Sequence, residues 1–465
     1  MFQIFWFRRD LRLDDNHGLY QALKQNQTTI PIFIFDEYIL KNLPEEDRRV
    51  SFLFDRIISL KKEIENCNSS LLVLYGKPEE IFLLLLENFP ISSVYLNHDY
   101  EPYAIERDNK IQILCRKKNI GFYSFKDQVI FEKDELLNQK EEPYKVYSQY
   151  KKAWFKKFDL HQLEEYPSKK YIKNFISLEM ISKYKNEFIK LLSKVKNIYE
   201  SLDYFVNKFP EPVLNKMNFK KTYYIMPEIH LDQIFLKDYK NTRDFPYLKR
   251  GTSHLSVYLR FGLVSIRDII NKSYFESKTF IEELIWREFY MYILYHYPYS
   301  ENLEWNLKYQ HLRKYWRNPD QDINAKKDFE LWCKGLTGYP LVDAGMRELN
   351  QTGYMHNRVR MICANFLVKD LHIDWKYGER YFALKLMDFE LASNVGNWQW
   401  CSGTGVDAAP YFRIFNPVLQ QKKFDPELKY CKKWIPELGT KKYPKPMVDH
   451  KKQKEEFIKL FTIFS

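Results

Sequence analysis

The chain has 465 residues, too many for one ordinary hydrophobic core, so two or three domains are expected. Hydrophobic residues make up 45% of it and aromatic residues 17%, which excludes general disorder. The formal net charge of +12 favours a polyanionic partner, because phosphates release counterions when they bind lysine and arginine, although a generally lysine-rich composition gives the same value. The six cysteines form no CxxC pair and no Cys/His spacing for zinc, so we expect reduced thiols and no metal site.

The N-terminal segment MFQIFWFRRD does not fit a signal peptide. Its apolar run is too short, and its charged residues follow that run instead of preceding it. No window of the sequence approaches the length of a membrane span. We therefore expect a soluble, cytoplasmic protein.

The first part of the chain alternates between two kinds of segment. Short runs rich in β-branched and aromatic residues occupy 2–7, 29–35, 70–75 and 93–96, and longer amphipathic segments such as 46–66 and 77–88 lie between them. This alternation predicts βαβ units and an α/β domain with a doubly wound parallel sheet over residues 1–130. No GxGxxG motif follows the first run, so a dinucleotide site is not indicated in this domain.

Residues 131–215 are rich in lysine and tyrosine, and prolines interrupt the pattern at Pro143, Pro167, Pro210 and Pro212. We interpret this segment as a connector that contains some helix. It includes the basic cluster KKAWFKK at 151–157. The lysine-rich run at 183–198 is more typical of a solvated helix face than of a DNA contact.

From residue 216 to 465 helical periodicity replaces the strand pattern. Eight of the ten tryptophans fall between Trp286 and Trp434. The sequence therefore predicts an all-α second domain.

The segment 388–417 combines polar and aromatic residues at unusual density. Asp388, Glu390 and Asn394 lie close in sequence to Trp398 and Trp400. Carboxylates, an amide and two indoles this near to one another indicate a polar pocket with aromatic walls. Such a pocket would suit a flat, hydrogen-bonding cofactor.

The segment GTSHLSVYLRFG at 251–262 places hydroxyl side chains at the predicted start of a helix. Thr252, Ser253 and Ser256, with the free N–H groups of a helix N-terminus, would suit a phosphate. On this motif alone, however, an ordinary N-cap is the simpler explanation.

Two further segments predict helix faces that carry both polar and large apolar side chains. Glu283 and Trp286 are three residues apart, and Tyr290 follows one turn later. Asn357 and Met361 share a face at i and i+4, and we expect Arg358 to point elsewhere. A substrate pocket would account for this mixture of polar and apolar side chains. A position in the hydrophobic core would also account for Trp286 and Met361.

Several motifs together resemble the photolyase/cryptochrome family, closest to the class I cyclobutane pyrimidine dimer photolyases. They are FWFRRDLRLDDN at 5–16, GTSHLS at 251–256, EELIWREFY at 282–290, TGYPLVDAGMRELNQTGYMHNRVRM at 337–361, and NWQW followed by GTGVDAAPYFRIFNP up to residue 417. The resemblance covers nearly the whole chain. It implies an α/β domain that can carry an antenna chromophore of unidentified kind, and an all-α domain that binds FAD and DNA.

The resemblance implies a set of FAD-binding residues. They are Tyr239, Thr252, Ser253, Leu255, Ser256, Arg287, Asn357, Arg360, Asp388, Glu390 and Asn394. Arg360 and Asp388 match a pair that braces the flavin, and Asn394 matches the position that faces flavin N5 in photolyases. The chain departs from the family pattern at Glu390, where Asp is usual, and at Tyr354, where many relatives have Trp.

The resemblance also implies that the protein is a monomer and that its partner is UV-damaged DNA. The implied reaction is light-driven electron transfer from fully reduced FAD to a flipped-out pyrimidine dimer. The implied lesion contacts are Glu283, Trp286, Tyr290, Asn357, Met361 and Trp400, and the implied phosphate contacts are Arg243, Arg358 and Gln420. Stabilisation of the transient dimer anion would come from Glu283 and neighbouring donors.

The indoles of Trp398, Trp375 and Trp316 match a family chain that relays electrons from the protein surface to oxidised flavin. Each of them by itself is more typical of a core position than of an electron relay. Three alternatives stay open: a (6-4) photolyase, a DASH-type cryptochrome, and a cryptochrome that acts as a blue-light sensor. Asn357, Met361 and the WQW sequence fit dimer repair best.

Overall fold

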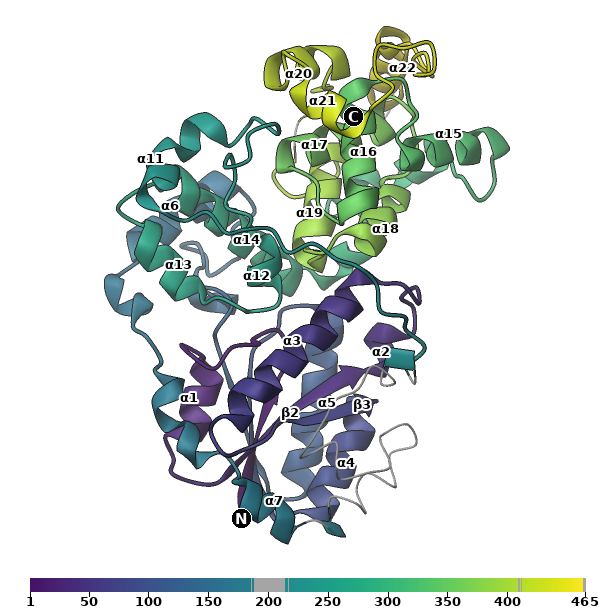
Figure 1. The fold of residues 1–465 in the computed structure, drawn as a ribbon. Helices are drawn as coiled ribbons and strands as arrows, with labels where there is room; N and C mark the ends of the chain where they lie inside the picture. The colour runs from purple at the N-terminus through teal and green to yellow at the C-terminus, as the bar shows by residue number, and fades with distance from the viewer. Residues whose placement is uncertain (185, 188–213, 216, 409, 411, 463–465) are drawn as a thin grey trace. The chain divides into compact units, whose positions relative to one another are not determined.

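The computed structural model describes residues 1–465 except 185, 188–213, 216, 409, 411 and 463–465 (Figure 1). Contacts divide the chain into two compact units. The first unit comprises residues 1–132, 158–224 and 256–271, and the second comprises 133–157, 225–255 and 272–465. Each unit is described separately below.

The first unit contains a five-stranded parallel sheet in the order β3-β2-β1-β4-β5 (Figure 1). Its strands are β1 (Phe2–Phe7), β2 (Thr29–Asp36), β3 (Leu72–Gly76), β4 (Ile91–Asn97) and β5 (Gly121–Phe125). Every residue of β1 and β2 is buried, as is typical of central strands covered on both faces. This explains why these strands appear in the sequence as continuous apolar runs.

Helices connect these parallel strands and cover the sheet. They are α1 (His17–Leu23), α2 (Glu37–Leu40), α3 (Arg48–Glu65), α4 (Pro78–Asn88) and α5 (Pro102–Lys117), with α7 (Leu178–Lys183), α12 (Ser256–Arg260) and most of α13 (Ile266–Ser273) added from later segments. Right-handed crossovers place α1 and α3 on one face of the sheet and α4 and α5 on the other. The core of this unit lies between the sheet and these two helix layers.

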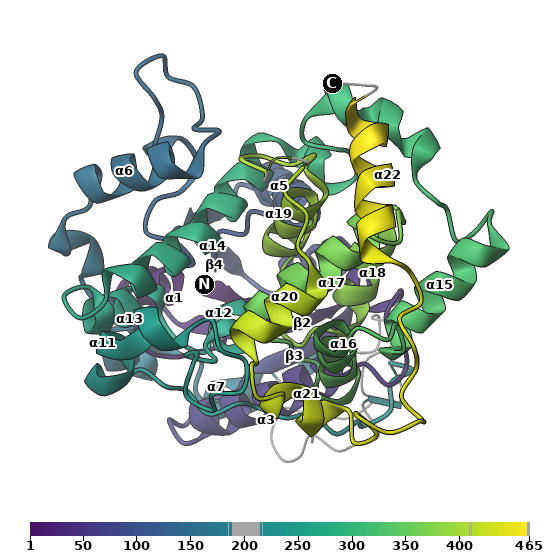
Figure 2. The same cartoon turned by 90° about the horizontal axis from the view of Figure 1, so that it is seen from above.

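The second unit is helical among its described residues. Its helices are α6 (Tyr147–Lys157), α11 (Gln233–Thr242), α14 (Lys278–His296), α15 (Ile323–Lys334), α16 (Pro340–Thr352), α17 (Asn357–Lys369), α18 (Trp375–Lys385), α19 (Leu391–Ser402), α20 (Pro417–Phe424), α21 (Lys429–Trp434) and α22 (His450–Thr462). The core forms where α17 packs on α16 and α19. Helix α22 packs on α17, and Figure 2 shows the two helices next to each other.

Local sequence signals set the ends of the helices around this core. Asp374 caps the start of α18 by accepting a hydrogen bond from the Lys376 N–H. A glycine with positive φ ends α16 (Gly353, φ 75°) and α19 (Gly403, φ 84°), because glycine adopts the left-handed conformation without steric cost. These caps set the residue at which α18 begins and the residues at which α16 and α19 end.

The predicted fold class is confirmed: a parallel α/β unit and a helical unit. All four predicted strands are present, but β5 was missed because it is a short edge strand whose side chains are largely exposed or half-buried. The predicted connector contains α6 and α7, while most of the run at 183–198 lies outside the described residues. The boundaries predicted for the three segments stay a prediction.

Candidate functional site

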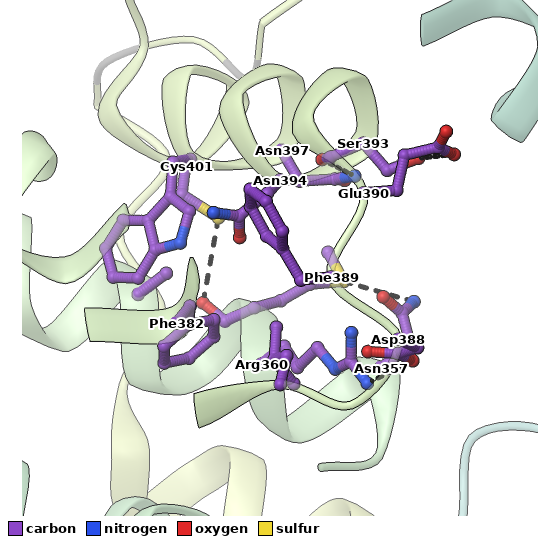
Figure 3. Close-up of a pocket in the computed structure, with 14 residues that line it drawn as sticks. Asn357, Arg360, Phe382, Asp388, Phe389, Glu390, Ser393, Asn394, Asn397 and Cys401 are labelled. Carbon is purple, nitrogen blue, oxygen red and sulfur yellow. Dashed lines mark hydrogen bonds and ion pairs between the residues drawn. The ribbon is translucent and has the colours of Figure 1, made fainter. Parts of the chain in front are cut away.

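A pocket in the second unit lies among α17, α18 and α19 and the residues that precede α19. It is partly open to solvent. Seven predicted site residues line it: Asn357, Arg360, Met361, Asp388, Glu390, Asn394 and Trp398 (Figure 3). Asp388, Glu390, Asn394 and Trp398 therefore converge on one cavity, whereas Trp400 does not line it.

An ion pair forms one wall of this pocket. Arg360 donates from Nη2 to Asp388 Oδ2 at 2.8 Å (Figure 3). The Arg360 Nε donates to the Met355 carbonyl at 2.7 Å. The Asp388 side chain is only 3% exposed. Its other oxygen, Oδ1, is buried and has no hydrogen-bond partner among the residues that the structure describes. A buried carboxylate oxygen left in this way can accept a hydrogen bond from a ligand.

Asn394 lies on α19 and contributes an oriented amide to the pocket. Its Nδ2 donates to Glu379 Oε1 at 2.8 Å and to the Glu379 carbonyl at 3.1 Å. Because these two bonds use both amide hydrogens, Asn394 Oδ1 is the atom left to accept from a ligand. Burial raises the pKa of Glu379, and Asn394 partly offsets that rise by donating to the carboxylate.

Sequence reasoning missed Glu379. The signal was present, since Glu379 follows Trp375 by four residues and therefore shares a helix face with it.

Glu390 lines the pocket but points away from the Arg360–Asp388 pair (Figure 3). Its Oε2 accepts from Ser393 Oγ at 3.4 Å and lies 3.9 Å from Arg287 Nε. The longer side chain of Glu390 thus reaches a second predicted FAD-binding residue, Arg287, on α14.

Trp398 is fixed by close packing against α18. A Cβ at Gly378 would lie 2.1 Å from Trp398 Cη2, so only glycine leaves room for the indole there. The Phe382 ring contacts Trp398 edge-on, with centroids 5.0 Å apart. Trp398 is 2% exposed and Trp375, the first residue of α18, is 1% exposed.

Trp316, the third tryptophan of the predicted electron chain, is also buried. Trp316 is only 8% exposed. Its ring packs against Phe457 of α22, with centroids 6.0 Å apart. The sequence could not show this, because Phe457 is far from Trp316 along the chain.

The residues predicted to bind the phosphates of FAD do not line this pocket. Tyr239 and Leu255 are buried, Thr252 and Ser253 are half-buried, and Ser256 is exposed. The predicted helix start is present: Ser256 begins α12, a helix of five residues that by contacts belongs to the first unit.

Tyr354 links the turn at Thr252 to the pocket wall. Its hydroxyl lies 3.4 Å from Thr252 Oγ1, and the guanidinium of Arg360 lies over its ring at 5.7 Å. Burial raises the pKa of Tyr354 to about 12, so its hydroxyl stays protonated and available as a donor. Tyr354 therefore connects the hydroxyl-rich turn with the ion pair that lines the cavity.

The predicted substrate residues Glu283 and Arg243 are paired with each other. Arg243 donates from Nη1 to Glu283 Oε1 at 2.6 Å. Arg358 forms a second pair with Asp244 at 2.6 Å, and its Nη1 also lies 3.6 Å from Met361 Sδ. The expectation that Arg358 points away from Met361 is therefore wrong, because the two are i and i+3 on α17.

The remaining predicted substrate residues lie outside the pocket lining. Trp286, Trp400 and Gln420 are half-buried, and Tyr290 is 5% exposed. Tyr290 is nevertheless tied to the pocket, because its hydroxyl donates to Oδ1 of the lining residue Asn397 at 3.3 Å.

A second pocket lies in the first unit at the carboxyl ends of β1, β2 and β4. Apolar side chains and four arginines line it. The guanidinium groups of Arg8 and Arg107 lie 5.0 and 4.7 Å from the centroid of the Trp6 ring. Its Nε1 is buried without a partner among the described residues. This is the position where ligands bind in open parallel sheets.

The charges of this second pocket are balanced by ion pairs. Arg8 and Arg107 contact Asp108, and Arg9 contacts Asp99 and Glu101. In the part of the chain that the structure describes, no group of three potential metal ligands occurs and no helix combines the length and hydropathy needed to cross a membrane.

Comparison with known proteins identifies relatives over the whole chain. Residues 3–169 match the family described as DNA photolyase, and residues 280–441 match the FAD binding domain of DNA photolyase. The deoxyribodipyrimidine photo-lyase of Alkalihalophilus pseudofirmus is 34% identical, and the match covers 98% of this chain and 97% of that protein.

Two solved structures share the fold. A class III photolyase from Agrobacterium tumefaciens superposes with a TM-score of 0.79 at 31% identity, covering 99% of this chain and 97% of the other. A photolyase from Sulfolobus tokodaii, described as containing two FAD molecules that imply a novel light-harvesting cofactor, gives a TM-score of 0.74 at 30% identity and covers all of both chains. The prediction of FAD as cofactor is confirmed by the domain match. The chain belongs to the DNA photolyase family.

Proposed function

We propose that this protein is a light-dependent DNA repair enzyme, a deoxyribodipyrimidine photo-lyase that splits cyclobutane pyrimidine dimers. The observation that carries the proposal is the pocket in which Asp388, braced by Arg360, keeps one buried oxygen without a partner opposite the oriented amide of Asn394. Relatives named for this activity span nearly the whole chain. The protein acts as a monomer inside the cell, where damaged DNA is its partner.

The residues of the pocket fit a flavin ring. A flavin offers ring N–H donors and carbonyl acceptors along one edge, and Asp388 Oδ1 and Asn394 Oδ1 are acceptors that need such donors. Arg360 holds Asp388 in place through their ion pair, and Trp398 and Phe382 supply flat apolar walls. When it is bound and reduced, FAD supplies the photoexcited electron that opens the cyclobutane ring and is then recovered.

The side chains around the pocket have separate roles in holding the rest of the cofactor. Thr252, Ser253 and Tyr354 provide hydroxyl donors for its phosphates, and Arg287 and Glu390 close one rim. Asn394 accepts a hydrogen bond without adding a charge of its own, and Glu379 keeps the amide in that orientation.

Damaged DNA is held by a second group of residues. Trp286 and Trp400 stack on the flipped-out bases, Glu283 and Asn357 hydrogen-bond their polar edges, and Met361 contacts their apolar side. Arg243, Arg358 and Gln420 bind phosphates and carry no sequence information. Because Arg243 and Arg358 are paired with Glu283 and Asp244, binding DNA exchanges these ion pairs for phosphate contacts.

Trp398, Trp375 and Trp316 serve as a route that brings electrons to the pocket when the cofactor is oxidised. Trp398 lies in the pocket wall, and the other two are buried. Their burial keeps each indole in one orientation, which suits electron hopping.

A second chromophore binds in the pocket of the first unit. Its apolar walls fit a planar ring, and the unpartnered Trp6 Nε1 offers one donor to it. Since the arginines there are already ion-paired, an uncharged ring fits better than a phosphate. Mass spectrometry of pigment released from purified protein identifies the ligand, and release of FAD alone in one equivalent would contradict this assignment.

The alternative is a cryptochrome-type photoreceptor, which would bind FAD without repairing DNA. The two are separated by incubating a dimer-containing oligonucleotide with chemically reduced protein in blue light and in the dark. Photolyase activity predicts restored thymines only in the light. A protein that binds FAD and responds to light but leaves the dimer intact would instead be a photoreceptor.

A further inference from the structure

Tyr147 is the first residue of α6, the helix that carries the basic cluster at 151–157, and it is 6% exposed. Helix α6 is held against α14 by a shared acceptor. Tyr150 Oη and Trp154 Nε1 both donate to Glu288 Oε1, at 3.0 and 2.8 Å. The position of Tyr147 relative to α14 is therefore fixed by the rest of its helix.

The ring of Tyr147 stacks on Trp286. The two ring centroids are 3.4 Å apart and their planes differ by 10°. The Tyr147 hydroxyl donates to the Glu282 carbonyl at 2.6 Å. Because Glu282 and Trp286 lie on the same helix, this bond prevents the tyrosine ring from sliding along the indole.

Tyr147 is also held from the opposite side, by the segment that follows α19. Its backbone N–H donates to Asp407 Oδ2 at 3.0 Å. This N–H is one of the free donors at the start of α6, and the preceding residue, Val146, has no side-chain acceptor. Asp407 therefore caps α6 from a distant part of the chain, five residues after the end of α19.

These contacts connect the two elements that carry the proposed base-stacking tryptophans. Trp286 lies on α14, and Trp400 lies on α19, just before the Asp407 segment. Tyr147 contacts Trp286 through its ring and the Asp407 segment through its backbone. It is too deeply buried to touch a bound lesion itself.

We propose that Tyr147 is a positioning residue for lesion recognition, which rests on the proposed function. It clamps one face of Trp286, so that the indole is held ready to stack on an extruded base before DNA arrives. Pre-organisation of this kind lowers the entropy lost on binding and strengthens binding of the lesion more than binding of undamaged DNA.

The first test measures the clamp without DNA. Protein labelled with 5-fluorotryptophan gives one ¹⁹F resonance per indole, and the Trp286→Phe variant assigns the resonance of Trp286. In Tyr147→Leu this resonance is expected to shift and to become sensitive to a solvent paramagnetic probe, while Tyr147→Phe, which keeps the stacked ring, changes it little. An unchanged Trp286 resonance in Tyr147→Leu would overturn the proposal.

The second test is a double-mutant cycle on DNA binding. Tyr147→Leu is expected to weaken binding of a dimer-containing oligonucleotide about two- to tenfold, the range for losing an aromatic pair, and to leave binding of undamaged DNA unchanged. In a Trp286→Leu background the same substitution should have no further effect. Phe155→Leu is the matched control, because Phe155 is an aromatic residue of α6 whose ring packs on Trp154.

The results separate this proposal from the proposed function. Additive losses in the cycle, or equal losses with undamaged DNA, would mean that Tyr147 only supports the fold of α6 and would refute the positioning role. Wild-type protein that does not distinguish dimer-containing from undamaged DNA would instead refute the proposed function, and the ¹⁹F resonance then decides by itself whether Tyr147 clamps Trp286.

Discussion

Replacing Asp388 with Asn tests the pocket at its most informative atom. The Asp388 carboxylate accepts a bond from Arg360 at 2.8 Å through one oxygen and leaves the other oxygen for the cofactor. Asparagine has one acceptor oxygen and one donor nitrogen, so it serves only one of these partners. A hydrogen bond to a charged group contributes about 1.5–3 kcal/mol, which predicts FAD binding weakened about 10- to 150-fold.

The assay is a titration of cofactor-free protein with FAD, followed by quenching of flavin fluorescence. Asp322→Asn is the control, because Asp322 is a carboxylate that caps α15 and pairs with Arg317 outside the pocket. Circular dichroism of both variants without FAD confirms that they fold. Asp388→Asn protein that binds FAD within about twofold of wild type, less than 0.5 kcal/mol, would refute the assignment of this oxygen to the cofactor.

Three further substitutions follow from the same structure. Glu379→Gln removes a buried negative charge beside Asn394 and should raise the midpoint potential of bound FAD at pH 8. The potential is measured by spectroelectrochemical titration. An unchanged potential would argue against contact between Asn394 and the flavin ring. Gly378→Ala places a Cβ 2.1 Å from the Trp398 ring. Chemical denaturation should show the protein destabilised by about 1–3 kcal/mol, although alanine has the better helix propensity. A stabilised variant would contradict the close packing of Trp398 on α18. Burial, with nearby Arg358, lowers the pKa of His356 to about 4, so the unfolded chain takes up a proton first as pH falls below about 6.5. Stability should therefore decrease from pH 6.5 to 4 by at most about 3 kcal/mol, and His356→Gln should flatten this dependence in denaturation curves recorded across that range.

The central strands could be predicted from the sequence because a strand covered on both faces must be apolar throughout. Residues 2–7 and 29–35 are such runs, and both form strands. Residues 121–125 form an edge strand with exposed side chains, and their composition carries no equivalent constraint. Helix α6 was hidden in a lysine-rich segment, because its buried side, Tyr147, Tyr150 and Trp154, is defined only by its packing on α14.

Within the site, the sequence predicted best where functional residues are close together along the chain. Asp388 and Asn394 lie on one short segment and meet in one pocket. Contacts between distant segments could not be predicted: Asn394 is oriented by Glu379 of α18, Arg243 pairs with Glu283 of α14, and Trp316 is covered from α22. In each case the partner is chosen by helix packing, which leaves no pattern in the local sequence.

The central claim is that the pocket beside Asp388 and Asn394 holds a flavin that drives repair of DNA with light. The most direct measurement is the rate of thymine dimer splitting by reduced, FAD-loaded protein as a function of wavelength. The account predicts a rate that follows the absorption of the bound chromophores and falls to zero in the dark. Dimers that remain intact at every wavelength, in protein that contains a full equivalent of reduced FAD, would contradict it.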